Sequence, residues 1–179
     1  TGGGGAFSDI GFDTPGVTYA FTGFGGAEDA SLAADPAGGG NTVAKVVKSA
    51  TAEAWAGTTV STGANNSVGA IPLSATSTTM TVRVYSPKAG IPVRLKVEDA
   101  ADETHSVETE AITTVANGWE TLTFDFSNEV SGTAAPEAVG TARLSSMSRL
   151  TRSSSGPRSR ISINSLPSRK VLTVEPDNE

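Results

Sequence analysis

The sequence predicts an all-β protein folded as one antiparallel β-sandwich. Short segments that alternate apolar and polar residues recur about every 10–15 residues along the chain. Polar or glycine-containing turns separate these segments, and hardly any stretch has the period of an amphipathic helix. Aromatic residues make up only 6% of the chain, which is otherwise rich in Gly, Thr, Ser and Ala. That composition is common in extracellular β proteins and unlike a helical bundle.

The expected strands follow in order from the alternation. In the first, at 16–24, Val17, Tyr19 and Phe21 share one parity, which predicts that Tyr19 belongs to the core. The clearest strand is IPVRLKVED at 91–99, where apolar residues alternate with charged ones without interruption. The remaining strands are expected at 41–50, 53–62, 77–86, 104–112 and 119–127.

Short turns at 87–90, 99–103 and 116–118 join the last four of these strands, so we expect them to be neighbours in one sheet. Their outward parities would then share one face. This face carries Arg83, Tyr85, Arg94, Lys96, Glu98, Ser106, Glu108 and Glu110, with Trp119, Thr121 and Asp125 as further members. One interpretation is a solvated face whose opposite charges pair across strands. The other is a ligand platform, because arginine and carboxylates match sugar hydroxyls and an aromatic ring can stack on a pyranose.

Charge and composition narrow the function classes. The chain has no cysteine, so disulfides, thiolate metal sites and a cysteine nucleophile are excluded. The net charge of −6 argues against a nucleic-acid partner, and no apolar run is long enough to span a membrane. The charge is also divided, because residues 140–174 contain only basic charged residues. We expect a linker at 1–11, one domain at 12–175 whose closing segment 140–174 is atypical and cationic, and a tail at 176–179.

Four blocks of sequence carry a resemblance to a known family: VTYAFTGFGGAEDASLAADP, NTVAKVVKSATAEAWAGTTV, TMTVRVYSPKAGIPVRLKVEDA and TVANGWETLTFDFS. Together they resemble a carbohydrate-binding module of the kind appended to secreted bacterial polysaccharide-degrading enzymes, notably family 16 glycoside hydrolases of the laminarinase and agarase type. The resemblance implies a jelly-roll sandwich that binds polysaccharide, has no catalytic activity, and is a secreted monomer attached to a catalytic domain. The resemblance does not name one glycan: it favours a laminarin-type β-glucan, whereas the local cations favour another algal polysaccharide, an acidic one such as alginate.

The closing segment departs from that family. Its members usually end with an apolar strand of the IFFDFG kind and a YYFDDV-like strand, whereas this chain has ARLSSMSRLTRSSSGPRSRISINSLPSRKVLTVEP. A shifted reading frame and a genuine variant both account for the change. RISINS and RKVLTVE still alternate, and we expect them to be strands that substitute for the usual closing pair.

The candidate ligand-binding residues are Trp55, Arg83, Tyr85, Arg94, Lys96 and Glu108. Trp55 lies between alanines and a glycine that are too small to bury it, and the resemblance favours a binding role for it. Tyr85 is outward by parity beside Arg83. Trp119 follows a turn and is interpreted as closer to structural.

A structural calcium ion is also expected, because jelly-roll binding modules commonly hold one. By resemblance, Asp13 in GFDTP matches the acidic residue that opens the first strand, and Glu28 and Asp29 lie in the next loop. Carboxylates and loop carbonyls are the oxygen ligands that calcium prefers. The alternative is that these are solvated loop acids.

Two other functions stay open. A jelly-roll polysaccharide lyase would use a basic residue to abstract a proton from a uronate, and Arg83, Arg94 and Lys96 are the clustered bases available. A structural or adhesive extracellular spacer would need only the sandwich. We expect no catalytic residues, since Glu108 and Glu110 have adjacent cations that favour ion pairing over glycosidase chemistry.

Overall fold

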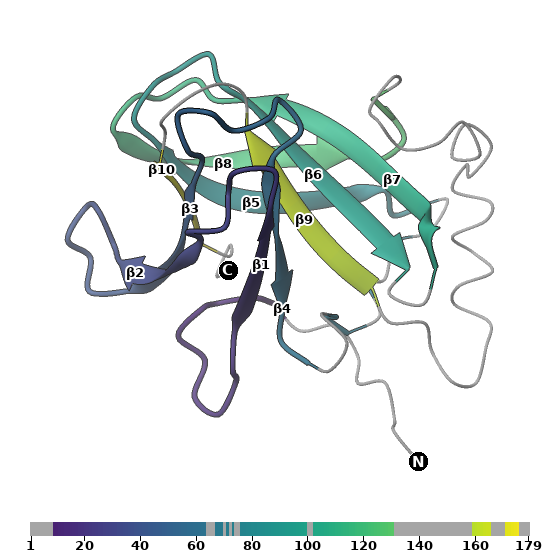
Figure 1. Cartoon of the computed structure of the whole chain (residues 1–179), viewed down its shortest axis with the longest axis horizontal. Coiled ribbons are helices and arrows are strands. Elements are labelled where there is room, and N and C mark those ends of the chain that lie inside the picture. Colours follow the sequence, from purple (N-terminus) through teal and green to yellow (C-terminus); the bar gives the residue numbers. More distant parts are fainter. Residues whose placement is uncertain are drawn as a thin grey trace.

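The computed structural model describes residues 9–63, 67–69, 71, 73, 76–99, 102–130, 159–165 and 171–175. Within these ranges the elements are all strands, and every pairing between them is antiparallel (Figure 1). None of the described residues forms a helix that is long and apolar enough to cross a membrane. The chain is therefore an antiparallel β-sandwich of the jelly-roll type, as the sequence predicts.

The sandwich has two five-stranded sheets. The first sheet has the order β1 (Ala20–Phe24), β4 (Gly57–Ser61), β9 (Ser159–Ser165), β6 (Pro92–Asp99) and β7 (Asp102–Ile112). The second sheet has the order β2 (Ser31–Ala34), β3 (Thr42–Val47), β10 (Val171–Glu175), β5 (Thr79–Ser86) and β8 (Gly118–Asp125).

The core lies between the sheets and uses the apolar parity of each strand. Val93, Leu95 and Val97 of β6 are buried, while the charged residues between them point away from the core. The facing sheet supplies Ala44, Val46, Val82, Val84, Leu122 and Phe124. Tyr19 packs against this core, as its parity predicts, with its ring 5.3 Å from that of Phe12. Full burial of such apolar side chains contributes about 1.5–3 kcal/mol each, which makes this layer the main source of stability.

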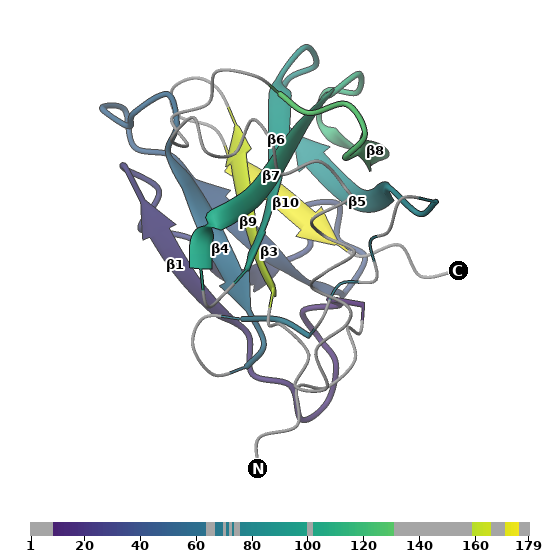
Figure 2. The same cartoon turned by 90° about the vertical axis from the view of Figure 1, so that its right-hand side faces the viewer.

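The two closing strands occupy the middle of the sheets. β9 pairs with β4 on one side and β6 on the other, and β10 pairs with β3 and β5. Figure 2 shows the two strands crossing, one in each layer. The expectation of two closing strands is confirmed for RISINS and for the VLTVE part of RKVLTVE, and each sheet depends on one of them for its continuity.

The expectation that four consecutive strands are neighbours in one sheet is wrong. β5 pairs with β8 in the second sheet, whereas β6 pairs with β7 in the first. The turns at 87–90 and 116–118 therefore carry the chain between the sheets. At this corner the side-chain hydroxyl of Thr113 accepts a hydrogen bond from the Ile91 N–H at 2.9 Å and donates one to the Lys88 carbonyl at 3.0 Å. Apolar and polar residues alternate in the same way whether the next connection is a hairpin within one sheet or a corner between two sheets. The sequence pattern therefore does not distinguish these two connections.

Candidate functional site

An aromatic and polar cluster lies on the outer face of the second sheet. Arg83 and Tyr85 on β5 alternate with the core residues Val82 and Val84, so they point away from the core. Directly opposite Tyr85 in the antiparallel register is Trp119 on β8. Side chains of directly opposed residues share one face of a sheet, which brings the indole to this surface.

The Trp119 ring is in contact with both neighbours on β5. The Tyr85 ring approaches it edge-on, with 5.6 Å between centroids and 70° between ring planes. The guanidinium carbon of Arg83 lies 5.3 Å from the centroid of the indole ring. Edge-to-face aromatic pairs and cation–π contacts each contribute about 0.5–1 kcal/mol or more, so these neighbours restrict the orientation of the indole.

Asp35 completes the arrangement from the connection that follows β2. Its Oδ1 accepts hydrogen bonds from the Trp119 Nε1–H at 3.1 Å and from the Ala37 N–H at 2.7 Å, and its Oδ2 accepts one from the Gly39 N–H at 3.1 Å. The Ala37 N–H is the main reason that the pKa of the Asp35 carboxyl is lowered, and the Trp119 and Gly39 N–H groups and the charge of Arg83 act in the same direction. Asp35, Arg83, Tyr85 and Trp119 are called the Trp119 cluster below.

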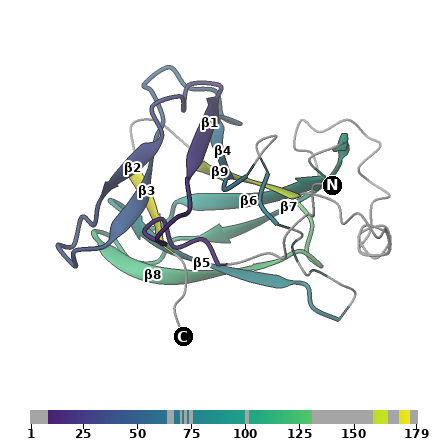
Figure 3. The ribbon, with the colours of Figure 1, turned by 90° about the horizontal axis from the view of Figure 1, so that it is seen from below.

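The hydrogen bond between Asp35 and Trp119 also indicates that the second sheet is not flat. β2 and β8 are its two edge strands, with three strands between them. In a flat sheet they would be about 19 Å apart at the usual spacing of 4.7–4.9 Å between strands. Figure 3 shows instead that β2 and β3 rise steeply from the plane of β5 and β8. The connection after β2 is thereby within hydrogen-bonding reach of β8.

The Trp119 cluster has the chemistry that sugar recognition requires. All four side chains are partly exposed, so each can contact both protein and solvent. A carboxylate accepts hydrogen bonds from sugar hydroxyls, a guanidinium donates them, and aromatic rings pack against the apolar face of a pyranose.

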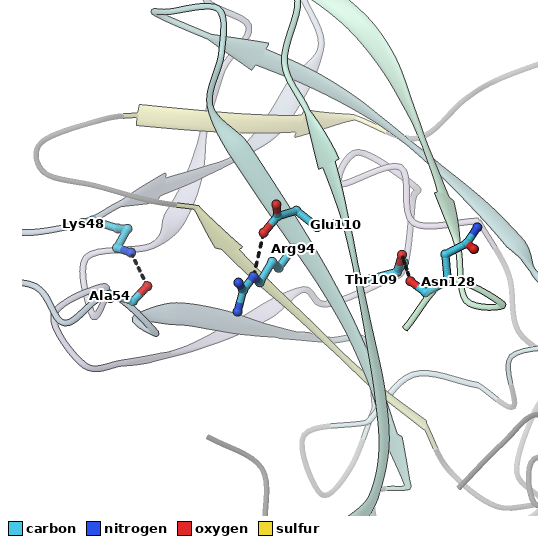
Figure 4. A network of polar contacts seen from close by, with 6 residues as sticks. All are labelled: Lys48, Ala54, Arg94, Thr109, Glu110 and Asn128. Atoms are coloured by element: carbon cyan, nitrogen blue, oxygen red, sulfur yellow. Dashed lines mark hydrogen bonds and ion pairs between the residues drawn. The ribbon is translucent and has the colours of Figure 1, made fainter. Parts of the chain in front are cut away.

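A second set of charges lies on the opposite side of the molecule, on the outer face of the first sheet. Arg94 and its cross-strand partner Glu110 form an ion pair at 2.8 Å (Figure 4), and Lys96 pairs with Glu98 on its own strand at 3.0 Å. Glu108 lies opposite Lys96. These five residues are called the charged ladder. Its ion pairs agree with the interpretation of a face on which opposite charges pair.

The structure therefore divides the predicted platform. Arg83 and Tyr85 face outward from the second sheet, whereas Arg94, Lys96 and Glu108 face outward from the first. One ligand lying flat on a single sheet face cannot contact both groups. The prediction of one shared platform is wrong because the corner at 87–90 places β5 and β6 in different sheets.

Trp55 belongs to neither face. It lies in the connection between β3 and β4 and is 52% exposed, as its small neighbours predict. Its ring stacks nearly parallel to that of Phe24, with 6.2 Å between centroids and 10° between planes.

The three predicted calcium ligands are exposed loop residues, and Glu28 accepts a hydrogen bond from the Gly26 N–H at 3.2 Å. Within the described ranges, no group of three or more carboxylate or histidine side chains is placed to hold a metal ion. Asp13, Glu28 and Asp29 thus do not form a ready-made site here, and calcium binding stays a prediction.

The sequence pattern does not identify Asp35, and it favours a structural role for Trp119 over a binding one. The parity of Trp119 with Thr121 on the outward face was the available signal. Nothing in the local pattern around Asp35 predicts a partner 84 residues away.

Two solved structures that are similar to this chain are carbohydrate-binding modules. The chain is similar to the family 11 carbohydrate-binding module of a cellulosomal cellulase of Clostridium thermocellum, with a TM-score of 0.54 and 14% identity over 96% of this chain and 93% of that one. A family 30 carbohydrate-binding module gives a TM-score of 0.52 and 8% identity over 98% and 88% of the respective chains. No protein-family model and no curated protein sequence matches the chain. At these identities the similarity establishes the fold.

Proposed function

We propose that the protein is a non-catalytic carbohydrate-binding module that targets a polysaccharide for an attached secreted enzyme. The observation that carries this proposal is the Trp119 cluster, where aromatic rings, a carboxylate and a guanidinium meet on one outer sheet face. The fold shared with carbohydrate-binding modules adds support.

The preferred ligand is a neutral glycan, for example a β-glucan of the laminarin type. Arg94 and Lys96 are engaged by Glu110 and Glu98, so the cations that would attract an acidic polysaccharide are offset by carboxylates on the same face. An acidic algal polysaccharide such as alginate would instead depend on the cations, because carboxylates pair bidentately with arginine, and in the Trp119 cluster the carboxylate of Asp35 also offsets Arg83. The Trp119 cluster favours the first ligand class.

The test is titration against a panel of laminarin, agarose-derived oligosaccharides, soluble cellulose oligosaccharides and alginate by isothermal titration calorimetry. We expect saturable binding of at least one neutral glycan that Tyr85→Ala and Trp119→Ala both weaken. Arg94→Ala, on the opposite sheet, is the matched control and should leave that affinity unchanged. Absence of binding across the panel would indicate the spacer function, and unsaturated products from alginate would indicate the lyase.

Salt dependence separates the two ligand classes. Contacts between exposed charges weaken as the Debye length falls from about 10 Å at 0.1 M salt to about 3 Å at 1 M. Stacking and neutral hydrogen bonds hardly respond. We expect the affinity for the neutral glycan to be nearly the same at both concentrations.

A further inference from the structure

Trp55 and Phe24 form an exposed aromatic pair outside the Trp119 cluster. Phe24 is the last residue of β1, and its register partner on β4 is Gly57. Trp55 lies two residues before Gly57 in the chain. The two rings are nearly parallel. Because the indole is 52% exposed while one side packs on protein, much of its aromatic surface faces solvent. Single exposed apolar residues are ordinary on protein surfaces, so the exposure of Trp55 alone does not identify a site, and the way the ring is held has to be considered.

The connection that carries Trp55 is fastened to the turn after β1. The Ser49 N–H donates to the Gly26 carbonyl at 2.6 Å, and the Glu53 N–H donates to the Gly25 carbonyl at 2.8 Å. Within the connection, the Ala56 N–H donates to the Glu53 carbonyl at 3.0 Å. These backbone hydrogen bonds fix the residues on both sides of Trp55.

Gly25 leaves room for the Trp55 ring, and Lys48 binds the backbone of the connection next to it. Gly25 has a φ of +66°, and a Cβ at this position would lie 2.8 Å from the Trp55 ring, so a larger residue would displace the ring. The Lys48 side chain is buried, and its Nζ donates to the carbonyl of Ala54 at 3.3 Å (Figure 4). Burial lowers the pKa of Lys48, so placing this ammonium group beside the connection has a desolvation cost.

Polar side chains suited to sugar hydroxyls lie on the same two segments. Ser49 and Thr51 have their hydroxyls 3.4 Å apart, and Glu28 and Glu53 are exposed carboxylates. An exposed aromatic surface, with hydroxyls and carboxylates on the segments around it, suits a neutral hexopyranose, whose apolar face can stack while its hydroxyls donate to oxygens. Carboxylates at this position disfavour a uronate.

We propose that Trp55, supported by Phe24 and Gly25, is a second sugar-binding position, which stacks on a neutral hexopyranose ring independently of the Trp119 cluster. It lies in a connection between the two sheets, whereas the Trp119 cluster lies on an outer sheet face. A module with two such positions can hold two parts of one polysaccharide or two neighbouring chains, and each contact raises the overall avidity.

The two tryptophans, Trp55 and Trp119, allow each position to be observed separately, since the chain contains no others. In Trp119→Phe, tryptophan emission comes from Trp55 alone; in Trp55→Phe, it comes from Trp119 alone. Laminarihexaose, cellohexaose and mannohexaose are titrated into each variant, with the melting temperature as a check of folding. We expect a saturable blue shift and protection from acrylamide quenching in Trp119→Phe with at least one of these sugars.

The outcomes distinguish this proposal from the proposed function. If Trp55→Phe responds to a sugar and Trp119→Phe responds to none, the Trp119 cluster binds and the second position is disproved. If Trp119→Phe alone responds, Trp55 binds sugar and the role of the Trp119 cluster is wrong. Silence in both variants overturns both ideas for these ligands. Gly25→Ala provides a second check, because displacing the indole should abolish the Trp55 response in a folded protein while leaving the Trp119 response intact.

Discussion

The indole Nε1 of Trp119 donates a hydrogen bond to Oδ1 of Asp35 at 3.1 Å, and this contact joins the two edges of the second sheet. Tyr85 and Arg83 contact the same indole from β5. The ring is therefore oriented before any ligand arrives, and such preorganisation lowers the entropic cost of binding. In the proposed binding mode, Asp35 orients Trp119 and is a positioning residue in this sense.

The first prediction concerns that role. Asp35→Ala removes the acceptor for the indole N–H, and we expect a severalfold loss of affinity for the neutral glycan by calorimetry. Asp35→Asn keeps an acceptor oxygen at the same place and should retain most of the affinity. Acrylamide quenching of Trp119, measured in a Trp55→Phe background, should rise in the alanine variant only. Equal losses in both variants would mean that the charge of Asp35 contacts the ligand directly.

A second prediction follows from the lowered pKa of Asp35. Folding lowers the pKa of the Asp35 carboxyl from its ordinary value of 3.8. The ionised carboxylate therefore stabilises the folded state at pH values above 3.8, and this stabilisation is lost as the pH falls through the lower pKa of the folded state. We expect the Trp119 emission of the Trp55→Phe variant to be constant from neutral pH down to about pH 4 and to change only in stronger acid. The same titration with Asp35→Asn should lack this step. A step near pH 6 would contradict the assignment.

Much of the fold could be predicted from the sequence because burial imposes a period of two. Val93, Leu95 and Val97 identify β6 and its core face without any knowledge of its neighbours. Which sheet a strand joins is decided by tertiary packing across corners such as Thr113 with Ile91, and no local pattern encodes it. The same contrast between local pattern and tertiary packing applies to the residues of the candidate site. Tyr85 was identified by parity, Trp119 by parity only in part, and Asp35 not at all, since its role depends on the bend of a complete sheet.

The third prediction tests the closing strands. Removing residues from 159 onward deletes β9 and β10, which separates β4 from β6 and β3 from β5. Their neighbours would expose unpaired backbone groups and apolar side chains of the core. We expect a chain ending at 158 to lack a cooperative thermal transition by circular dichroism. A chain ending at 175 keeps both strands and is the control. A cooperative transition in the shorter chain would show that the sheets form without them.

The fourth prediction concerns calcium. A metal ion that binds the folded state alone raises the melting temperature in proportion to the logarithm of its concentration. If Asp13, Glu28 and Asp29 hold calcium, adding a chelator should lower the melting temperature, and Glu28→Gln with Asp29→Asn should abolish the difference. An unchanged melting temperature after chelation would leave these residues as solvated loop acids.

The fifth prediction separates the two sheet faces. The Arg94–Glu110 pair has side-chain exposures of 25% and 28%, and pairs of this kind contribute about 0.2–1 kcal/mol. In a double-mutant cycle with Arg94→Ala and Glu110→Ala, we expect a coupling within that range in the free energy of unfolding, measured by denaturation, and no change in affinity for a neutral glycan. Tyr85→Ala should give the opposite result, with weaker binding and little coupling to Arg94. Should Arg94→Ala weaken neutral-glycan binding as strongly as Tyr85→Ala, the ligand would have to reach both faces, and the charged ladder would belong to the binding site.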